Sequence, residues 1–196
     1  MSTFPLASDG VFWTLQGEGA LSGEPMAFVR LAGCSVGCPE CDTDYRVVER
    51  VTVKEIVRRI QLIVPAGFWP WVWITGGEPL DHDITPLVDC LRTINFRVAL
   101  ATSGNKPIQQ AQLYNWISVS PHVAEPVQRF GHEIKVVPAL NGLTWGDVDA
   151  IDNWCHFPYK FIQPLYGADV QPHIDFVLSH PGWRLTSQAH KPWGLK

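Results

Sequence analysis

Short runs of β-forming residues alternate with amphipathic segments along most of this chain, and this alternation limits its fold more than any other feature. The runs are typical of buried strands and cover residues 28–31, 71–75, 97–101, 116–120, 134–137, 159–163 and 184–186. Apolar residues at helical spacing follow several of them, over residues 53–63, 84–94, 144–154 and 170–178. This alternation predicts a mostly parallel sheet with connecting helices.

The chain is too short for a complete eight-stranded barrel. It has 196 residues, whereas about 250 are typical of a closed (β/α)8 barrel. Some connections, such as residues 121–133, are too short or too rich in proline for a full helix. The expected fold class is α/β, a partial (β/α) barrel with about six parallel strands and reduced helices, in a single domain over residues 1–196. Thr52 and Glu55 are predicted to form a capping box before the first helix.

The charge pattern argues against nucleic acid and membranes as direct partners. The formal net charge is −4 and Lys and Arg form no run, whereas binding a phosphate backbone requires clustered cations. The most apolar stretch, residues 62–75, contains Pro65 and Pro70 and is too short to span a bilayer. No signal peptide is visible over residues 1–9, so we expect a cytoplasmic protein.

Polar motifs follow the predicted strands at their carboxyl ends. They cover residues 34–43, 76–78, 102–104, 120–122 and 163–164. In parallel α/β sheets, ligands bind at these strand ends. The motifs therefore predict one shared site.

Three of the five cysteines lie within eight residues, at Cys34, Cys38 and Cys41. An odd, clustered set does not suit a secreted disulfide framework, and it favours a metal. The spacing lets three thiolates converge from one loop, either on a zinc ion with a histidine as fourth ligand or on an iron–sulfur cluster with one iron left open. Cys90 and Cys155 have no clustered partner and are expected to be buried apolar residues.

The C-x3-C-x2-C motif after one strand and Gly76-Gly77-Glu78-Pro79 after the next resemble the radical S-adenosylmethionine superfamily. Within it, the chain resembles the 7-carboxy-7-deazaguanine synthase family over nearly its whole length. The motifs that carry this resemblance lie at residues 14–19, 28–34, 41–43, 75–79, 119–121, 133–137, 163–164 and 188–191.

The resemblance implies a carbon–nitrogen lyase that converts 6-carboxy-5,6,7,8-tetrahydropterin to 7-carboxy-7-deazaguanine with loss of ammonia, a step of queuosine and other deazapurine biosynthesis. It implies a [4Fe–4S] cluster, S-adenosylmethionine and Mg²⁺ as cofactors. The implied partners are the pterin, a flavodoxin-like or other one-electron reductant, and a second copy of the chain in a homodimer.

The resemblance also implies which residues hold each group. The cluster ligands would be Cys34, Cys38 and Cys41, and Thr43 would ligate Mg²⁺ together with bound substrate. Glu78 would accept a hydrogen bond from the ammonium group of S-adenosylmethionine. The full set expected around that cofactor is Glu40, Cys41, Asp42, Gly76, Gly77, Glu78, Ser103, Ser120, Pro121, His122, Gln163, Pro164, Leu165 and Tyr166.

A second set of residues is expected to bind the pterin, namely Leu15, Gln16, Gly17, Glu18, Arg30, Thr75, His190 and Lys196. Arg30 lies on an apolar strand and needs a carboxylate partner, which the pterin or the protein itself would provide. The tail is expected to close over the substrate, with Trp193 packing it down and the Lys196 α-carboxylate accepting from the amino-pyrimidine edge.

Three positions depart from the family pattern, and two other classes of protein remain open. Glu40 replaces an aromatic residue, Ala101 replaces a glutamate, and His122 replaces a lysine. One alternative is a radical enzyme that activates a glycyl-radical protein. The other is a zinc- or cluster-bearing binding module without catalytic activity.

Overall fold

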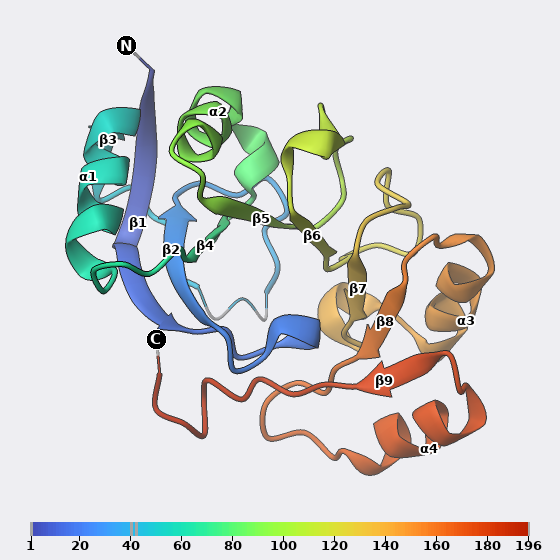
Figure 1. Ribbon diagram of the computed structural model, residues 1–196. Helices are drawn as coiled ribbons and strands as arrows, with labels where there is room; N and C mark the ends of the chain where they lie inside the picture. Colours follow the sequence, from blue (N-terminus) through green and yellow to red (C-terminus); the bar gives the residue numbers. More distant parts are fainter. Residues whose placement is uncertain (1, 40, 42, 196) are drawn as a thin grey trace.

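A computed structural model describes residues 2–39, 41 and 43–195 of the chain. Its strands form one nine-stranded sheet in the order β3-β1-β2-β4-β5-β6-β7-β8-β9 (Figure 1). The strands are β1 (Thr3–Leu15), β2 (Pro25–Leu31), β3 (Glu49–Thr52), β4 (Trp71–Gly76), β5 (Arg97–Thr102), β6 (Trp116–Val119), β7 (Glu133–Val136), β8 (Tyr159–Ile162) and β9 (Trp183–Leu185). The helices are α1 (Val53–Ile63), α2 (Thr85–Thr93), α3 (Trp145–Trp154) and α4 (Gln171–Ser179), with short 3-10 turns η1 (Gly19–Leu21), η2 (Pro79–Asp81), η3 (Ala111–Leu113) and η4 (Leu140–Gly142).

The expected partial barrel is confirmed. Strands β2 and β4 to β9 pair in parallel, which makes seven parallel strands against the six or so expected. Figure 1 shows them fanning in chain order, with the tail returning from β9 toward the end of β1. No helix in the described part of the chain is long and apolar enough to cross a membrane.

Two antiparallel strands at one edge, β1 and β3, were not expected. Pro5 and the Asp9-Gly10 pair interrupt the period-two pattern of β1, and its pairing with β2 shifts register between Leu6 and Val11. Strand β3 is short and pairs with the start of β1. Both strands are stabilised by pairing with residues distant in sequence. Their local sequence therefore predicts them only weakly.

The two faces of the sheet differ in chemistry because strand side chains alternate in direction. The outer face presents aliphatic residues such as Ile74 to the helices and forms the main core. On the inner face, Phe28 lies beside Trp73 near the strand starts, and Arg30 lies beside Thr75 two residues later. The inner face is therefore apolar at the strand starts and polar at the strand ends.

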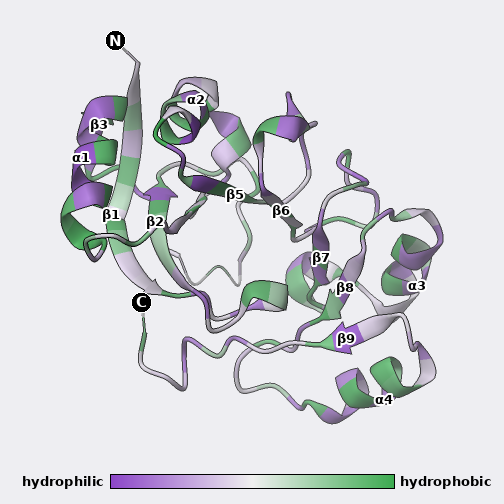
Figure 2. Ribbon diagram, in the orientation of Figure 1, coloured by the Kyte–Doolittle hydropathy of each residue, from purple (hydrophilic) through white to green (hydrophobic). Residues whose placement is uncertain are grey.

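The helices pack one face on the sheet, and Figure 2 shows apolar and polar residues interspersed along α1 and α2. The side chain of Thr52 caps α1 by accepting from the Glu55 amide at 3.2 Å. The predicted capping box is wrong in its second half, because the Glu55 carboxylate binds Arg58 and Arg59. These ion pairs join residues three and four positions apart, the spacing at which side chains meet along a helix.

Candidate functional site

A cavity of about 520 Å³ opens at the carboxyl ends of the parallel strands. It brings together residues from both ends of the chain and from most strands between them. The predicted site residues that line it are Leu15, Gln16, Gly17, Glu18, Arg30, Cys34, Cys38, Cys41, Thr43, Thr75, Gly76, Gly77, Glu78, Ser103, Ser120, His122, Gln163, Leu165 and His190.

Three of the predicted site residues that the structure describes do not line the cavity, namely Pro121, Pro164 and Tyr166. Pro121 and Pro164 belong to the strand-end turns beside it, and Tyr166 is 61% exposed. Glu40, Asp42 and Lys196 lie outside the described residues. Tyr166 nevertheless stays near the site, because the Lys191 ammonium lies 5.5 Å from the centre of its ring.

The cysteine loop follows β2 and is held against the turn that follows β4. The Gly77 amide donates to the Leu31 carbonyl at 2.9 Å, and the Glu78 amide donates to the Gly33 carbonyl at 3.0 Å. A Cβ atom added to Gly77 would lie 1.8 Å from the Gly33 oxygen. Glycine is therefore required where the two loops meet, because no side chain fits between them.

The three clustered cysteines face the same cavity. Cys34 and Cys38 are half-buried, Cys41 is exposed, and all three line the cavity. Among the described residues, no three His, Cys, Asp or Glu side chains lie close enough to hold one metal ion. A four-iron cluster binds each thiolate on a different iron, so its ligands are spread more widely than those of zinc. Three thiolates that line one cavity are the donor set that such a cluster would use.

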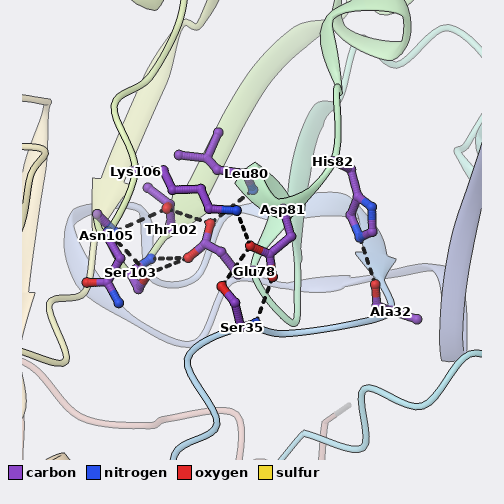
Figure 3. A network of polar contacts seen from close by, with 11 residues as sticks. Ala32, Ser35, Glu78, Leu80, Asp81, His82, Thr102, Ser103, Asn105 and Lys106 are labelled. Atoms are coloured by element: carbon purple, nitrogen blue, oxygen red, sulfur yellow. Dashed lines mark hydrogen bonds and ion pairs between the residues drawn. The ribbon is translucent and has the colours of Figure 1, made fainter.

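Glu78 is buried, with 2% of its surface exposed, and its carboxylate accepts four hydrogen bonds (Figure 3). Thr102 donates its hydroxyl at 2.7 Å, Ser103 donates both its amide and its hydroxyl, and the Leu80 amide donates at 3.0 Å. An ionised carboxylate has about four acceptor positions. In this arrangement Glu78 joins the Gly76-Gly77 turn to the end of β5.

A second carboxylate in Figure 3 fastens the cysteine loop to the same region. Asp81 accepts from the amide and the hydroxyl of Ser35 at 2.7 and 2.8 Å, and Lys106 pairs with it at 2.6 Å. Burial raises the pKa of Asp81, but the bonds from Lys106 and Ser35 outweigh it and lower the pKa below its usual value. Asp81 therefore stays ionised and holds the loop.

On the opposite side of the cavity, Glu18 forms an ion pair with Lys135, an inward-facing residue of β7. Burial raises the pKa of Glu18, whereas the Lys135 charge and hydrogen bond lower it, with smaller contributions from His190 and Gln188. The net effect is a pKa below the usual value, so the carboxylate is charged at neutral pH. The Gln163 amide donates to Glu18 at 3.4 Å.

The carbonyl oxygen of the Gln163 side chain is buried and has no hydrogen-bond partner in the described structure. Gln163 is 4% exposed and lines the cavity. A buried acceptor without a donor is costly. This orphaned oxygen indicates a ligand that supplies an N–H or O–H group at this point of the cavity.

Arg30 has a partner within the protein. Its guanidinium donates to Asp9 at 2.8 Å and lies 5.0 Å from the centre of the Phe12 ring. Asp9 belongs to the irregular part of β1, where the register shift occurs. Arg30 also lines the cavity, so the internal pair orients a guanidinium that faces the site.

The tail packs against the loop at residues 15–19. The Ala189 amide donates to the Gly17 carbonyl at 2.9 Å, and a Cβ atom on Gly17 would lie 2.6 Å from Nδ1 of His190. Leu195 lines the cavity. The expected packing by Trp193 is not seen, because that residue is 50% exposed and backbone bonds within residues 188–195 hold the tail instead.

Sequence reasoning missed several residues that line the cavity, namely Phe28, Val36, Trp73, Ala101, Thr102, Lys135, Val137, Leu140, Gln188, Lys191 and Leu195. Lys135 is the most informative of them. It lies within the 133–137 motif and, like Glu133, carries a charge on a strand with apolar residues at Ile134 and Val136, a pattern that calls for a partner.

Comparison with known proteins agrees with this geometry. No protein-family model matches the chain. The 7-carboxy-7-deazaguanine synthase of Burkholderia multivorans is 34% identical over 92% of this chain and 94% of its own length. The Synechocystis protein of the same name is 32% identical over 99% and 94%. The crystal structure of QueE from Escherichia coli aligns with a TM-score of 0.74 and 26% identity, over 96% of this chain and 95% of that one. The chain therefore belongs to the 7-carboxy-7-deazaguanine synthase family.

Proposed function

We propose that the cavity at the strand ends is where this chain converts 6-carboxy-5,6,7,8-tetrahydropterin to 7-carboxy-7-deazaguanine with loss of ammonia. This activity belongs to the family and makes the protein a carbon–nitrogen lyase of the queuosine pathway. The observation that carries the proposal is that the three cysteines, the Gly76-Gly77 turn and the loop at residues 15–18 line one cavity. Neither a glycyl-radical activase nor a zinc-bearing module explains all three.

Cys34, Cys38 and Cys41 would hold the [4Fe–4S] cluster. When bound, the cluster and S-adenosylmethionine supply one-electron radical chemistry to the pterin. The chain contributes a loop fixed by Asp81 and Lys106 and the cavity that this loop borders.

The residues proposed around S-adenosylmethionine lie between the cysteine loop and the ends of β4 to β8. Gly76 and Gly77 line the cavity, and their backbone would border the methionyl part. Glu78 holds that turn in place through its hydrogen bonds with Ser103. The side-chain carbonyl oxygen of Gln163 has no hydrogen-bond donor in the described structure. The remaining proposed contacts are Glu40, Asp42, Ser103, Ser120, Pro121, His122, Pro164, Leu165 and Tyr166.

The pterin would occupy the side of the cavity formed by the loop at residues 15–18 and the tail. Arg30, oriented by Asp9, suits the pterin carboxylate because a guanidinium binds carboxylates in a planar, bidentate way. Leu15, Gly17 and Thr75 line the same side. The other polar groups proposed there belong to Gln16, Glu18, His190 and Lys196.

Thr43 is proposed as a Mg²⁺ ligand that acts together with bound substrate. Thr43 lines the cavity, and Mg²⁺ keeps several waters or substrate oxygens in its shell. Thr43→Ala is expected to lower turnover and weaken its dependence on Mg²⁺, while the iron content stays at the wild-type level. Equal rates for metal-free and metal-replete wild-type enzyme would contradict this assignment.

The experiment that tests the function is anaerobic reconstitution with iron and sulfide, then incubation with the pterin, S-adenosylmethionine and dithionite. We expect 7-carboxy-7-deazaguanine to accumulate. Cys38→Ala should abolish product and cofactor cleavage, whereas Cys90→Ala should retain both. No product from iron-loaded wild-type protein, or full activity in Cys38→Ala, would refute the proposal.

The proposed partners follow from the same chemistry. A flavodoxin-like or other one-electron donor would reduce the cluster, because dithionite is only its laboratory substitute. We also propose that the active form is a homodimer of single-domain chains, which light scattering at several concentrations would test.

A further inference from the structure

A histidine contacts one of the three clustered cysteines directly. Nδ1 of His122 lies 2.8 Å from Sγ of Cys38, and both residues are half-buried and line the cavity. The two residues are 84 positions apart in the sequence, so the contact is made by the fold and not by the cysteine loop itself. It links the turn after β6 to the cysteine loop after β2.

The position of His122 is set by its surroundings. Pro121 precedes it and is buried, which restricts the backbone at the end of β6. The Ser120 amide donates to the Thr102 carbonyl at 2.8 Å, and Asn141 donates its side-chain amide to the His122 carbonyl at 3.0 Å. These hydrogen bonds therefore hold the turn so that the His122 imidazole lies next to the Cys38 sulfur.

We infer that His122 donates a hydrogen bond from Nδ1 to the Cys38 sulfur of the loaded cluster and thereby raises the reduction potential of that cluster. The inference rests on the proposed function, because it requires Cys38 to be a cluster ligand. A ligating sulfur is a thiolate, which only accepts hydrogen bonds, so the imidazole must be the donor. Hydrogen bonds to the sulfurs are one of the factors that set the potential of such clusters.

The direction of the effect follows from charge. A low-potential one-electron donor adds one electron to the cluster, and no bond is broken in that step. The reduced cluster and its thiolates carry one more negative charge than the oxidised form. A donor at the sulfur therefore stabilises the reduced form more strongly, as charge-assisted hydrogen bonds do. His122 thus acts as a positioning residue for electron entry and does not itself bond to iron.

Two substitutions separate the hydrogen bond from simple space filling. His122→Leu removes the donor, whereas His122→Asn keeps an amide N–H near the position of Nδ1. His156→Asn, at an exposed site outside the cavity, is the matched control. All proteins are reconstituted as full chains and their iron and sulfide contents are measured before any comparison.

The midpoint potential of each reconstituted protein is measured by dithionite titration followed by electron paramagnetic resonance. We expect His122→Leu to load iron as the wild type does. Its midpoint potential should be lower by ~59 mV, which for one electron is a tenfold change in the reduction equilibrium. His122→Asn should recover part of the shift, and His156→Asn should show none. Wild-type and His122→Leu clusters with equal potentials would overturn the inference.

Spectroscopy of the reduced cluster distinguishes the remaining outcomes. In protein labelled with ¹⁵N-histidine, a weak nitrogen coupling that disappears in His122→Leu supports a hydrogen bond. A coupling as strong as that of a directly bound nitrogen would show ligation to iron and contradict the inference. Failure of the wild-type chain to form a cluster would remove the proposed function as well, whereas equal potentials in loaded proteins would leave it intact.

Discussion

At the scale of single residues, the contact between two loops depends on Gly77. Its amide bonds to Leu31, and a Cβ atom at this position would overlap the Gly33 carbonyl at 1.8 Å. That carbonyl belongs to the backbone directly before Cys34, so it has no free end that rotates away. The cysteine loop can therefore lie in its observed position only because the backbones of Gly33 and Gly77 approach each other closely.

We predict that Gly77→Ala lowers the free energy of unfolding by about 1–3 kcal/mol, as expected for overpacking. It should also reduce the iron bound after reconstitution, because the cysteine loop must move. Urea unfolding and iron analysis measure the two effects. Gly146→Ala in α3, where a Cβ atom meets its nearest neighbour at 3.6 Å, should lower neither, because alanine favours a helix over glycine. Unchanged stability and iron content in Gly77→Ala would contradict the account.

The ion pair of Glu18 with Lys135 predicts a dependence of stability on pH. The folded pKa of Glu18 is lowered from its usual value of 4.5. The unfolded chain therefore binds more protons than the folded one over the interval between the two values. The stabilisation is complete above about pH 4.5 and is lost as the pH falls through the folded pKa.

Glu18→Gln should therefore be less stable than wild type near neutral pH, and the difference should shrink in acid. Urea unfolding of both proteins at about pH 7 and about pH 3.5 measures this change. Glu24→Gln, at an exposed position of the same hairpin, is the control and should show no pH-dependent difference. A Glu18→Gln deficit that is the same at both pH values would show that the charge is not the cause.

At the scale of elements, the loop that carries Gln16 and Glu18 is docked on β7. Glu133, 1% exposed on the inner face of β7, accepts from the Ala20 amide at 2.8 Å. A Cβ atom on Gly19 would lie 2.5 Å from the same carboxylate, and φ of Gly19 is +67°. Glycine at position 19 thus allows both the turn and the close docking.

Glu133→Ala is expected to raise KM for the pterin, because the loop loses its anchor, while cofactor cleavage without substrate continues. Glu133→Gln keeps an acceptor for Ala20 and should stay near the wild-type KM. Glu125→Ala, at an exposed position, controls for loss of charge. Steady-state kinetics of turnover beside an assay of uncoupled cleavage separates docking from cluster chemistry. An unaltered KM in Glu133→Ala would refute this role.

At the scale of the whole molecule, the first and last segments of the chain meet at the mouth of the cavity. The Ala189 amide bonds to Gly17, and His190 packs against it. None of the described residues 189–195 is buried. The tail therefore contributes to the site more than to the core.

A chain that ends at Gln188 should fold with nearly the wild-type stability, load the cluster and cleave the cofactor without substrate. Its KM for the pterin should rise, because His190 and Leu195 no longer close the cavity. Circular dichroism, iron analysis and steady-state kinetics test the three statements. Unchanged pterin KM would remove the tail from the site, and loss of iron binding would show that it supports the whole fold.

Much of this molecule could be predicted from the sequence because its patterns are local. Alternating β-runs and amphipathic segments indicated a partial parallel barrel, and the strand-end motifs indicated one site. The cysteine spacing and the Gly76-Gly77 pair indicated the superfamily, and short motifs along the rest of the chain indicated the family, which the relatives confirm. These signals depend on neighbours within a few residues, so one sequence contains them in full.

Contacts between distant segments were decided by the tertiary structure. The irregular strand β1 exists because β2 and β3 pair with it, and its register shift brings Asp9 to Arg30. The same holds for Lys135 with Glu18 and for His122 with Cys38, which are 117 and 84 positions apart. Such pairs form when the sheet curves and its inner face closes, a long-range geometry that no local pattern encodes.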